Sequence, residues 1–270
     1  MRKSKTLTML LQTLAKKGVI LPWDLTIKKG TSLERIRKMI LDLNKINVFQ
    51  IYGDITSSNF KIVLNDSFNF LTLNKRVKII YDEDRSRTMI FRHHIITLKE
   101  IDKIEATSYW TLDHKNIPIL RLFTPKRELG KILIDKVDKG YQRLYVKWVL
   151  NPPAKIGEGI IYGFRIEHKN YFTFNREETI AKYSEEEMME GLQIPNPTMI
   201  AVLEIQFPKD YEFKDVKAER YDLVLVDGPQ SSYYPIPKDR HKLFIEKNSI
   251  TLKLIYPPIG HYFVAWKPAK

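Results

Sequence analysis

Leucines near the start of the chain recur at helical spacing. In residues 5–17 they follow the i, i+3, i+4, i+7 pattern, at Leu7, Leu10, Leu11 and Leu14. This pattern predicts an amphipathic helix with one buried face, and Gly18 is suited to end it. A second short element covers residues 23–29. Pro22 suits the first turn of a helix there, but alternating apolar residues suit a short strand equally, so both alternatives stay open.

A stronger helix signal follows Gly30. Thr31 and Glu34 have the spacing of a capping box, in which the hydroxyl and the carboxylate each accept a hydrogen bond from a free backbone N–H. The predicted helix runs from Ser32 to about Lys45 and buries four apolar residues, Leu33, Ile36, Ile40 and Leu43. Residues 48–52 and 60–64 then read as two strands of a hairpin, joined by a polar loop.

Beyond residue 65 the pattern changes to short apolar runs with period two. From about residue 76 we identify ten to twelve β-rich runs, a spacing typical of β-sandwiches. An acidic stretch, 176–192, reads as a helical excursion, and 135–140 is the expected seam between two sandwiches. The fold class is therefore mixed and mainly β, with a small N-terminal domain followed by one or two antiparallel β-sandwiches. The expected domains are 1–65, 66–138 (first antiparallel β-sandwich) and 139–270 (second β-sandwich with the excursion).

The charge is unevenly distributed. The net charge is +13, and residues 1–64 hold twelve Lys or Arg against four Asp or Glu, a balance of +8. The other 206 residues contribute only +5. A module that binds phosphates concentrates positive charge in this way, whereas a charge that serves solubility alone is spread over the surface.

The chain lacks the residues that several classes of chemistry require. The chain has no Cys, which removes disulfides and thiolate metal sites. Its six histidines show no metal-ligand spacing, and no phosphate-cradling glycine loop or nucleophile motif occurs. We therefore expect no enzyme, catalytic residue, cofactor or metal. No apolar run is long enough to span a bilayer and no signal peptide is recognisable, so we expect a soluble cytoplasmic protein without membrane contact.

Two resemblances follow from element order and from short motifs. The order helix, short element, turn, capped helix and hairpin over residues 5–64 resembles the winged helix-turn-helix family. The rest of the chain resembles an uncharacterised tandem β-sandwich tail of bacterial and archaeal proteins, through Leu150-Asn151-Pro152-Pro153, Gly157-Glu158, Tyr162, residues 203–208, residues 256–262 and Trp266. The first resemblance implies a DNA-binding domain, and the second implies a body that recognises a partner.

The expected DNA contacts come from three places. Arg35 or Arg37 in the capped helix suits guanine, which arginine contacts with two hydrogen bonds, while Lys38 suits a phosphate. Further contacts are expected at Lys45, from the hairpin loop and its second strand (Ser57, Ser58, Asn59 and Lys61), and from a basic N-terminal arm (Arg2, Lys3 and Lys5).

The sequence therefore favours a DNA-binding regulator or adaptor whose β-rich body binds a protein partner or a ligand. The alternative is a non-enzymatic interaction module that uses its N-terminal unit for protein contacts. The DNA site, the partner, the direction of regulation and the oligomeric state are left open by the sequence.

Overall fold

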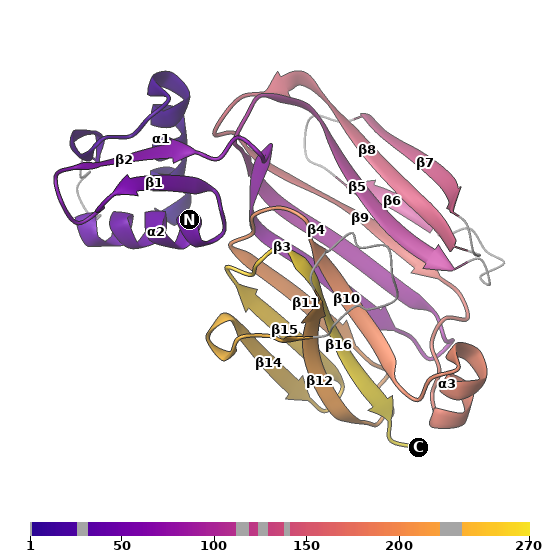
Figure 1. Ribbon diagram of the computed structural model, residues 1–270. Coiled ribbons are helices and arrows are strands. Elements are labelled where there is room, and N and C mark those ends of the chain that lie inside the picture. Colours follow the sequence, from indigo (N-terminus) through magenta and orange to yellow (C-terminus); the bar gives the residue numbers. More distant parts are fainter. Residues whose placement is uncertain (1, 26–31, 112–118, 124–128, 138–140, 222–233) are drawn as a thin grey trace.

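The computed structural model describes residues 2–25, 32–111, 119–123, 129–137, 141–221 and 234–270; side chains are described except at 2–5, 106–111, 119–123, 129–137, 141–146 and 221. A small N-terminal unit precedes a larger β-rich body (Figure 1). The unit consists of helix α1 (Arg2–Lys17), the 3-10 turn η1 (Pro22–Asp24), helix α2 (Leu33–Lys45) and the hairpin of β1 (Phe49–Gly53) and β2 (Phe60–Leu64).

Helix α1 has the predicted buried face. All four leucines of its stripe are at most 4% exposed. The helix ends as expected, because Gly18 takes a backbone φ of +73° and donates its N–H to the Leu14 carbonyl at 2.7 Å. It begins earlier than predicted, at Arg2, so the expected N-terminal arm is helical.

The described part of the element between the two helices is a 3-10 turn. Pro22–Asp24 form a single 3-10 turn, and residues 26–29 of the predicted second element lie outside the described residues. Asp24 holds the turn, because its carboxylate accepts the Leu21 N–H at 3.0 Å and pairs with Lys17. Both contacts, the hydrogen bond from Lys17 first, lower the pKa of Asp24.

Helix α2 is capped by Ser32, whose hydroxyl accepts the Arg35 N–H at 3.3 Å. The predicted cap, Thr31, lies outside the described residues. The helix buries three of the four predicted residues, together with Met39, while Leu33 is partly buried.

Three sheets build the body (Figure 1). The largest has seven strands in the order β14 (His241–Glu246), β15 (Ser249–Ile255), β11 (Ile200–Gln206), β3 (Phe70–Tyr81), β4 (Arg87–Thr97), β9 (Gly159–His168) and β6 (Ile119–Phe123). A four-stranded sheet has the order β10 (Met188–Ile194), β16 (Gly260–Pro268), β12 (Phe213–Tyr221) and β13 (Tyr234–Pro235). The third has the order β5 (Ile101–Thr111), β8 (Tyr141–Ala154) and β7 (Leu129–Val137).

The mainly β class is confirmed, but the division into two antiparallel sandwiches is not what the strands form. Within the seven-stranded sheet β9 pairs with β4, and β11 lies parallel to β3, so strands from both sides of residue 138 share one sheet. The sheet is therefore mixed. Local alternation of apolar residues marks a strand but carries no record of its long-range partner, which is why the seam was misplaced.

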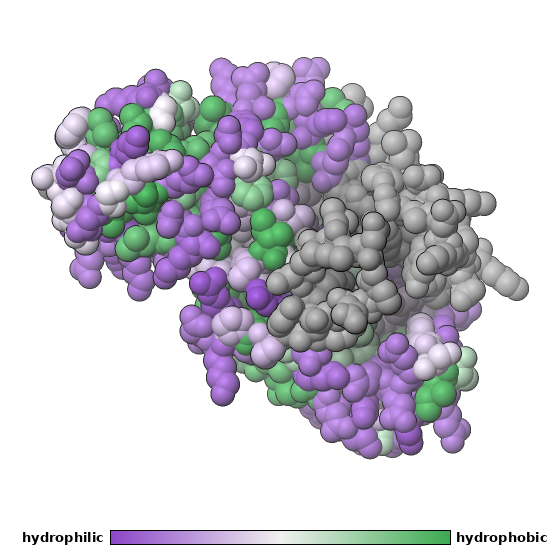
Figure 2. All heavy atoms as spheres, viewed as in Figure 1, coloured by the Kyte–Doolittle hydropathy of each residue, from purple (hydrophilic) through white to green (hydrophobic). Residues whose placement is uncertain are grey.

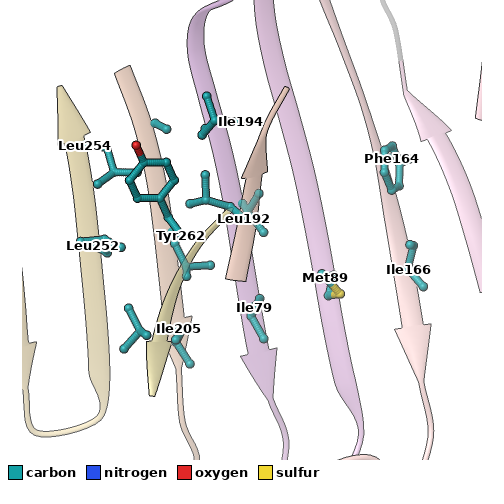
Figure 3. Close-up of a cluster of buried hydrophobic side chains, with 14 of the residues drawn as sticks. Ile79, Met89, Phe164, Ile166, Leu192, Ile194, Ile205, Leu252, Leu254 and Tyr262 are labelled. Carbon is teal, nitrogen blue, oxygen red and sulfur yellow. The ribbon is translucent and has the colours of Figure 1, made fainter. Parts of the chain in front are cut away.

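One apolar core joins the three sheets. Side chains of β3, β9, β11 and β15 belong to one buried cluster with those of β10 and β16 from the four-stranded sheet. Figure 3 labels Ile79, Ile166 and Leu192 among its members. Trp148 of β8 brings the three-stranded sheet into the same cluster. The seven-stranded sheet is thus covered on one face by the two smaller sheets.

The acidic excursion is only partly helical. Helix α3 (Arg176–Tyr183) is capped by Asn175, whose side chain accepts the Glu178 N–H at 2.9 Å. The chain then continues as strand β10 from Met188, within the range expected to be helical. Glu190 of this strand is buried.

The N-terminal unit packs directly on the body. Its apolar core, built from α1, α2 and the hairpin, includes four buried body residues, Leu71, Ile96, Leu98 and Met199. At Gly157, with φ of +79°, a Cβ would lie 3.3 Å from Cγ of Gln12 in α1. The charge of Asp42 in α2, after burial, raises the pKa of Tyr256 in the body. Because apolar residues of both parts share one cluster, we expect them to move together.

Candidate nucleic-acid interface

One side of α2 carries exposed positive charge. Arg35, Lys38 and Lys45 are exposed, whereas the opposite side of the helix is buried in the unit. The spacing of three and then seven residues places these three side chains along one stripe. Lys45 forms an ion pair with Asp42, with 3.7 Å between Nζ and Oδ1. Because this pairing partly neutralises Lys45, Arg35 and Lys38 are the stronger contacts for an anion.

Arg37 has a different environment from the three exposed cations of α2. Its guanidinium donates to the Thr56 carbonyl at 3.3 Å, and its Nε is buried. The side chain therefore joins the first half of α2 to the loop between β1 and β2. Of the two arginines expected to contact bases, Arg35 is the exposed one and Arg37 fixes the loop beside it.

The hairpin loop is organised around Asp54. The carboxylate accepts the hydroxyl of Thr56 at 2.7 Å and its N–H at 2.8 Å. These two hydrogen bonds, and then the charge of Arg37, lower the pKa of Asp54. Ser57 is held as well, because its hydroxyl donates to the Asp54 carbonyl and accepts the Asn59 N–H.

The loop presents small polar residues to solvent. Ser57, Ser58 and Asn59 are all exposed, as expected from the sequence. Because Ser57 already serves the turn, Ser58 and Asn59 are better placed for outside contacts. Hydroxyl, amide and backbone N–H groups of such a loop suit phosphate oxygens.

The exposed face of the hairpin adds an aromatic residue that the sequence analysis missed. Tyr52 and Lys61 are cross-strand partners, and Lys61 Nζ lies 4.7 Å from the Tyr52 ring centroid. Tyr52 is 49% exposed. The alternation along β1, with Gln50 and Tyr52 on the outer side, contains the signal that would have found it.

Figure 1 places the start of α2 and the hairpin loop at the end of the unit away from the sheets, and Figure 2 shows hydrophilic side chains along the side of the unit formed by α2. The structure therefore brings the first half of α2, with Arg35 and Lys38, beside the hairpin loop, whereas Lys45 lies at the other end of the helix. Arg2, Lys3 and Lys5 fall in the first turns of α1, and their side chains lie outside those that the structure describes.

Histidines and carboxylates are the side chains that could form a metal-binding arrangement in the described part of the chain. No group of three or more His, Asp or Glu there is arranged to hold a metal ion. His93 and His94 point to opposite faces of β4, as expected, with His93 buried and His94 half-buried. Among the described helices none is long and apolar enough to cross a membrane.

Comparison with known proteins gives no family. No family model matches the chain, and no curated protein matches it. Solved structures do match at low similarity. A candidate protease from Parabacteroides distasonis shares 10% identity at a TM-score of 0.42, covering 74% of this chain and 41% of that one. Yeast LTA4 hydrolase in complex with bestatin shares 10% identity at a TM-score of 0.39, covering 74% and 29%.

An M1 zinc metallopeptidase from Deinococcus radiodurans shares 6% identity at a TM-score of 0.31, covering 73% of this chain and 42% of that one. The chain thus spans less than half the length of these proteins, and at these TM-scores the matches carry no argument about activity.

The two resemblances stated from sequence are therefore wrong. The matching structures named above are a protease, a hydrolase and a peptidase, not winged-helix proteins or β-sandwich tails. The described residues are mostly β, and their helices are few and short. Element order along a short segment was too general a signal to identify a family.

Proposed function

We propose that the outward surface of α2 and the β1–β2 loop binds duplex DNA, and that the chain acts as a DNA-binding regulator or adaptor. The observation that carries the proposal is the position of Arg35 and Lys38, exposed on the side of α2 whose neighbouring loop is fixed by the hydrogen bond from Arg37 to Thr56. Exposed cations beside a polar loop that is held in place suit a line of phosphates.

Each residue has a role in this proposal. Arg35, near the start of α2, contacts a base edge or a phosphate, and Lys38 contacts a phosphate. Ser58 and Asn59 add hydrogen bonds from the loop to the backbone of the duplex. Tyr52 and Lys61 extend the surface along the hairpin.

The test compares two double variants of the full chain. Arg35→Ala with Lys38→Ala removes two charges from the proposed surface. Lys209→Ala with Lys214→Ala removes two exposed charges from the body and serves as the control. Binding to a mixed-sequence duplex is followed by fluorescence anisotropy between about 50 and 200 mM salt.

We expect the first variant to bind more weakly and its plot of log K against log salt to be shallower by about 0.9 if Lys38 alone contacts a phosphate and by about 1.8 if Arg35 does so too, because each phosphate contact contributes about 0.9 to the slope. The control keeps the wild-type slope. The proposal fails if the wild-type chain shows no salt-dependent binding, or if both variants lose affinity equally, since the effect would then follow from net charge alone.

A second candidate is a protein-interaction module, and one observation favours it. Trp23 in η1 is 71% exposed, and Leu41 on α2 is 41% exposed. Exposed tryptophan is a common anchor of protein interfaces. This candidate gains support if a defined protein partner is released by Trp23→Ala but retained by the Arg35 and Lys38 double variant; the reverse pattern contradicts it.

A further inference from the structure

A row of polar residues interrupts the apolar core of the body. Lys75 of β3, His93 of β4 and Tyr162 of β9 are successive partners across the seven-stranded sheet. Lys75 shares its face with Val77 and Ile79, both fully buried, because residues two apart on a strand point the same way. All three polar side chains therefore point between the sheets.

The facing sheets close around this row. Lys75 Nζ donates to the Gln193 carbonyl of β10 at 2.6 Å. His261, the partner of Gln193 on β16, lies near enough for the charge of Lys75, after burial, to lower its pKa. Trp148 of β8 lies over the Tyr162 ring, with 4.9 Å between the ring centroids. Strands of all three sheets thus meet here.

Two buried polar atoms beside this row have no hydrogen-bond partner among the described residues. His93 Nε2 and Trp148 Nε1 form no hydrogen bond with the described residues, although the two residues are 7% and 1% exposed. A buried donor or acceptor without a partner is costly, and folded proteins contain few of them. The two atoms belong to residues that both pack against the Tyr162 ring, and we take them as groups available to a bound molecule.

The protonation states follow from the contacts. Burial, and then the charge of Lys75, lower the pKa of His93 well below its ordinary value, so its ring is neutral at neutral pH. The Tyr162 hydroxyl lies 3.0 Å from His93 Nδ1. If the hydroxyl donates to Nδ1, the ring proton is on Nε2, because a neutral imidazole carries one N–H. Lys75, His93 and Trp148 then all present donors.

Lys75 also forms no ion pair with the described residues. Burial alone lowers its pKa, to about 8, so the ammonium form predominates at neutral pH without a carboxylate beside it. A cation and two N–H donors in an apolar surrounding match an anion with oxygen acceptors.

We propose that Lys75, His93 and Trp148 form a binding site for a small monocarboxylate between the sheets of the body. The carboxylate oxygens accept hydrogen bonds from the three donors, and the aromatic rings of Trp148 and Tyr162 pack against the rest of the ligand. This site is separate from the DNA surface, so its test is independent of that proposal.

The indole N–H of Trp148 gives a direct readout. The full chain has four tryptophans, and Trp148→Phe assigns its indole signal in a nitrogen–proton NMR spectrum. The wild-type chain is titrated separately with acetate, benzoate and inorganic phosphate. Sodium fluoride keeps the ionic strength constant in each titration. We expect the Trp148 signal to shift to saturation with at least one of the two carboxylates.

The variants separate the site from general salt effects. Lys75→Met is expected to weaken carboxylate binding by about tenfold or more, because a charge-assisted contact is lost. Lys253→Met, on the outer face of the same sheet, is the matched control and keeps the wild-type affinity. If Lys75→Met does not fold, the pH dependence of carboxylate binding to the wild-type chain tests the proposal instead. Binding must weaken as the pH rises above about 8, because Lys75 then loses its proton.

Three results overturn the proposal. The first is no saturable shift of the Trp148 signal with either carboxylate. The second is a shift with phosphate alone, which assigns the site to another class of anion. The third is carboxylate binding that neither Lys75→Met nor high pH weakens.

Discussion

Arg87 and Glu190 form a two-point ion pair in the interior of the body, although 103 residues separate them in sequence. Nε and one terminal nitrogen of Arg87 each donate to a different carboxylate oxygen at 2.5 Å. The Tyr81 hydroxyl donates to the same carboxylate at 2.5 Å, and the guanidinium lies 4.5 Å from the Tyr171 ring centroid. The pair joins the first residue of β4 to the middle of β10, and so the seven-stranded sheet to the four-stranded one.

Removing one partner of this pair should destabilise the chain strongly. In Glu190→Gln the buried guanidinium loses its counter-charge, and we expect the free energy of unfolding to fall by about 3–5 kcal/mol. Urea denaturation followed by circular dichroism measures this. Glu178→Gln, which breaks the exposed pair with Arg85, is the control and should cost at most about 1 kcal/mol. Equal losses in both variants would contradict the interior role of Arg87.

Lys75 should make the free energy of unfolding depend on pH in the alkaline range. Its pKa is about 8 in the folded chain and has its ordinary value of 10.5 in the unfolded chain. Between these values the unfolded chain holds a proton that the folded chain has released, so the free energy of unfolding rises with pH across this window. Urea denaturation on both sides of the window measures the rise. Lys75→Met should remove this part of the rise, and an unchanged rise in the variant would refute the assignment.

The N-terminal unit and the body should unfold together in one transition. Leu71→Ala removes a fully buried side chain from the shared cluster, and we expect a loss of about 2–5 kcal/mol. Thermal unfolding monitored by far-ultraviolet circular dichroism and by tryptophan fluorescence should give one common midpoint. Leu41→Ala, at an exposed position of α2, should change stability by about 0.5 kcal/mol or less. Two separate midpoints in the wild-type chain would show that the parts unfold independently.

The end of α1 should depend on its glycine. Gly18→Ala places a Cβ on a backbone with φ of +73°, which costs about 1 kcal/mol even though the Cβ would meet no atom within 4 Å. The loss therefore reports backbone strain alone. Gly18→Asn, a residue that tolerates this conformation better, should recover part of it in the same urea experiment. An alanine variant as stable as the wild type would show that the left-handed turn is not needed.

Features set by neighbouring residues could be predicted from the sequence. The leucine stripe predicted the buried face of α1, and the apolar run 60–64 marked β2 from end to end. The exposed stripe of α2 followed from the same spacing rule. Each of these depends on contacts within a few turns or one hairpin, which helical and strand periods describe directly.

Features set by distant partners could not be predicted. Glu190 belongs to the acidic stretch that reads as a helical excursion, and only its pairing with Arg87 explains why it is buried. The parallel contact of β3 with β11 joins strands more than a hundred residues apart. Arg37 looked equivalent to Arg35, but the backbone of the hairpin loop engages its guanidinium.

The apolar cluster shared by α1, α2 and the body has a consequence for how the chain can be divided. A fragment starting at residue 66 would leave Leu98 and Met199 uncovered, and a fragment ending at residue 65 would uncover the opposite side of the same cluster. Either fragment would expose an apolar surface and would tend to aggregate. The basic unit is therefore not a transferable module that can be cut out or grafted elsewhere, and its activity has to be studied in the intact chain.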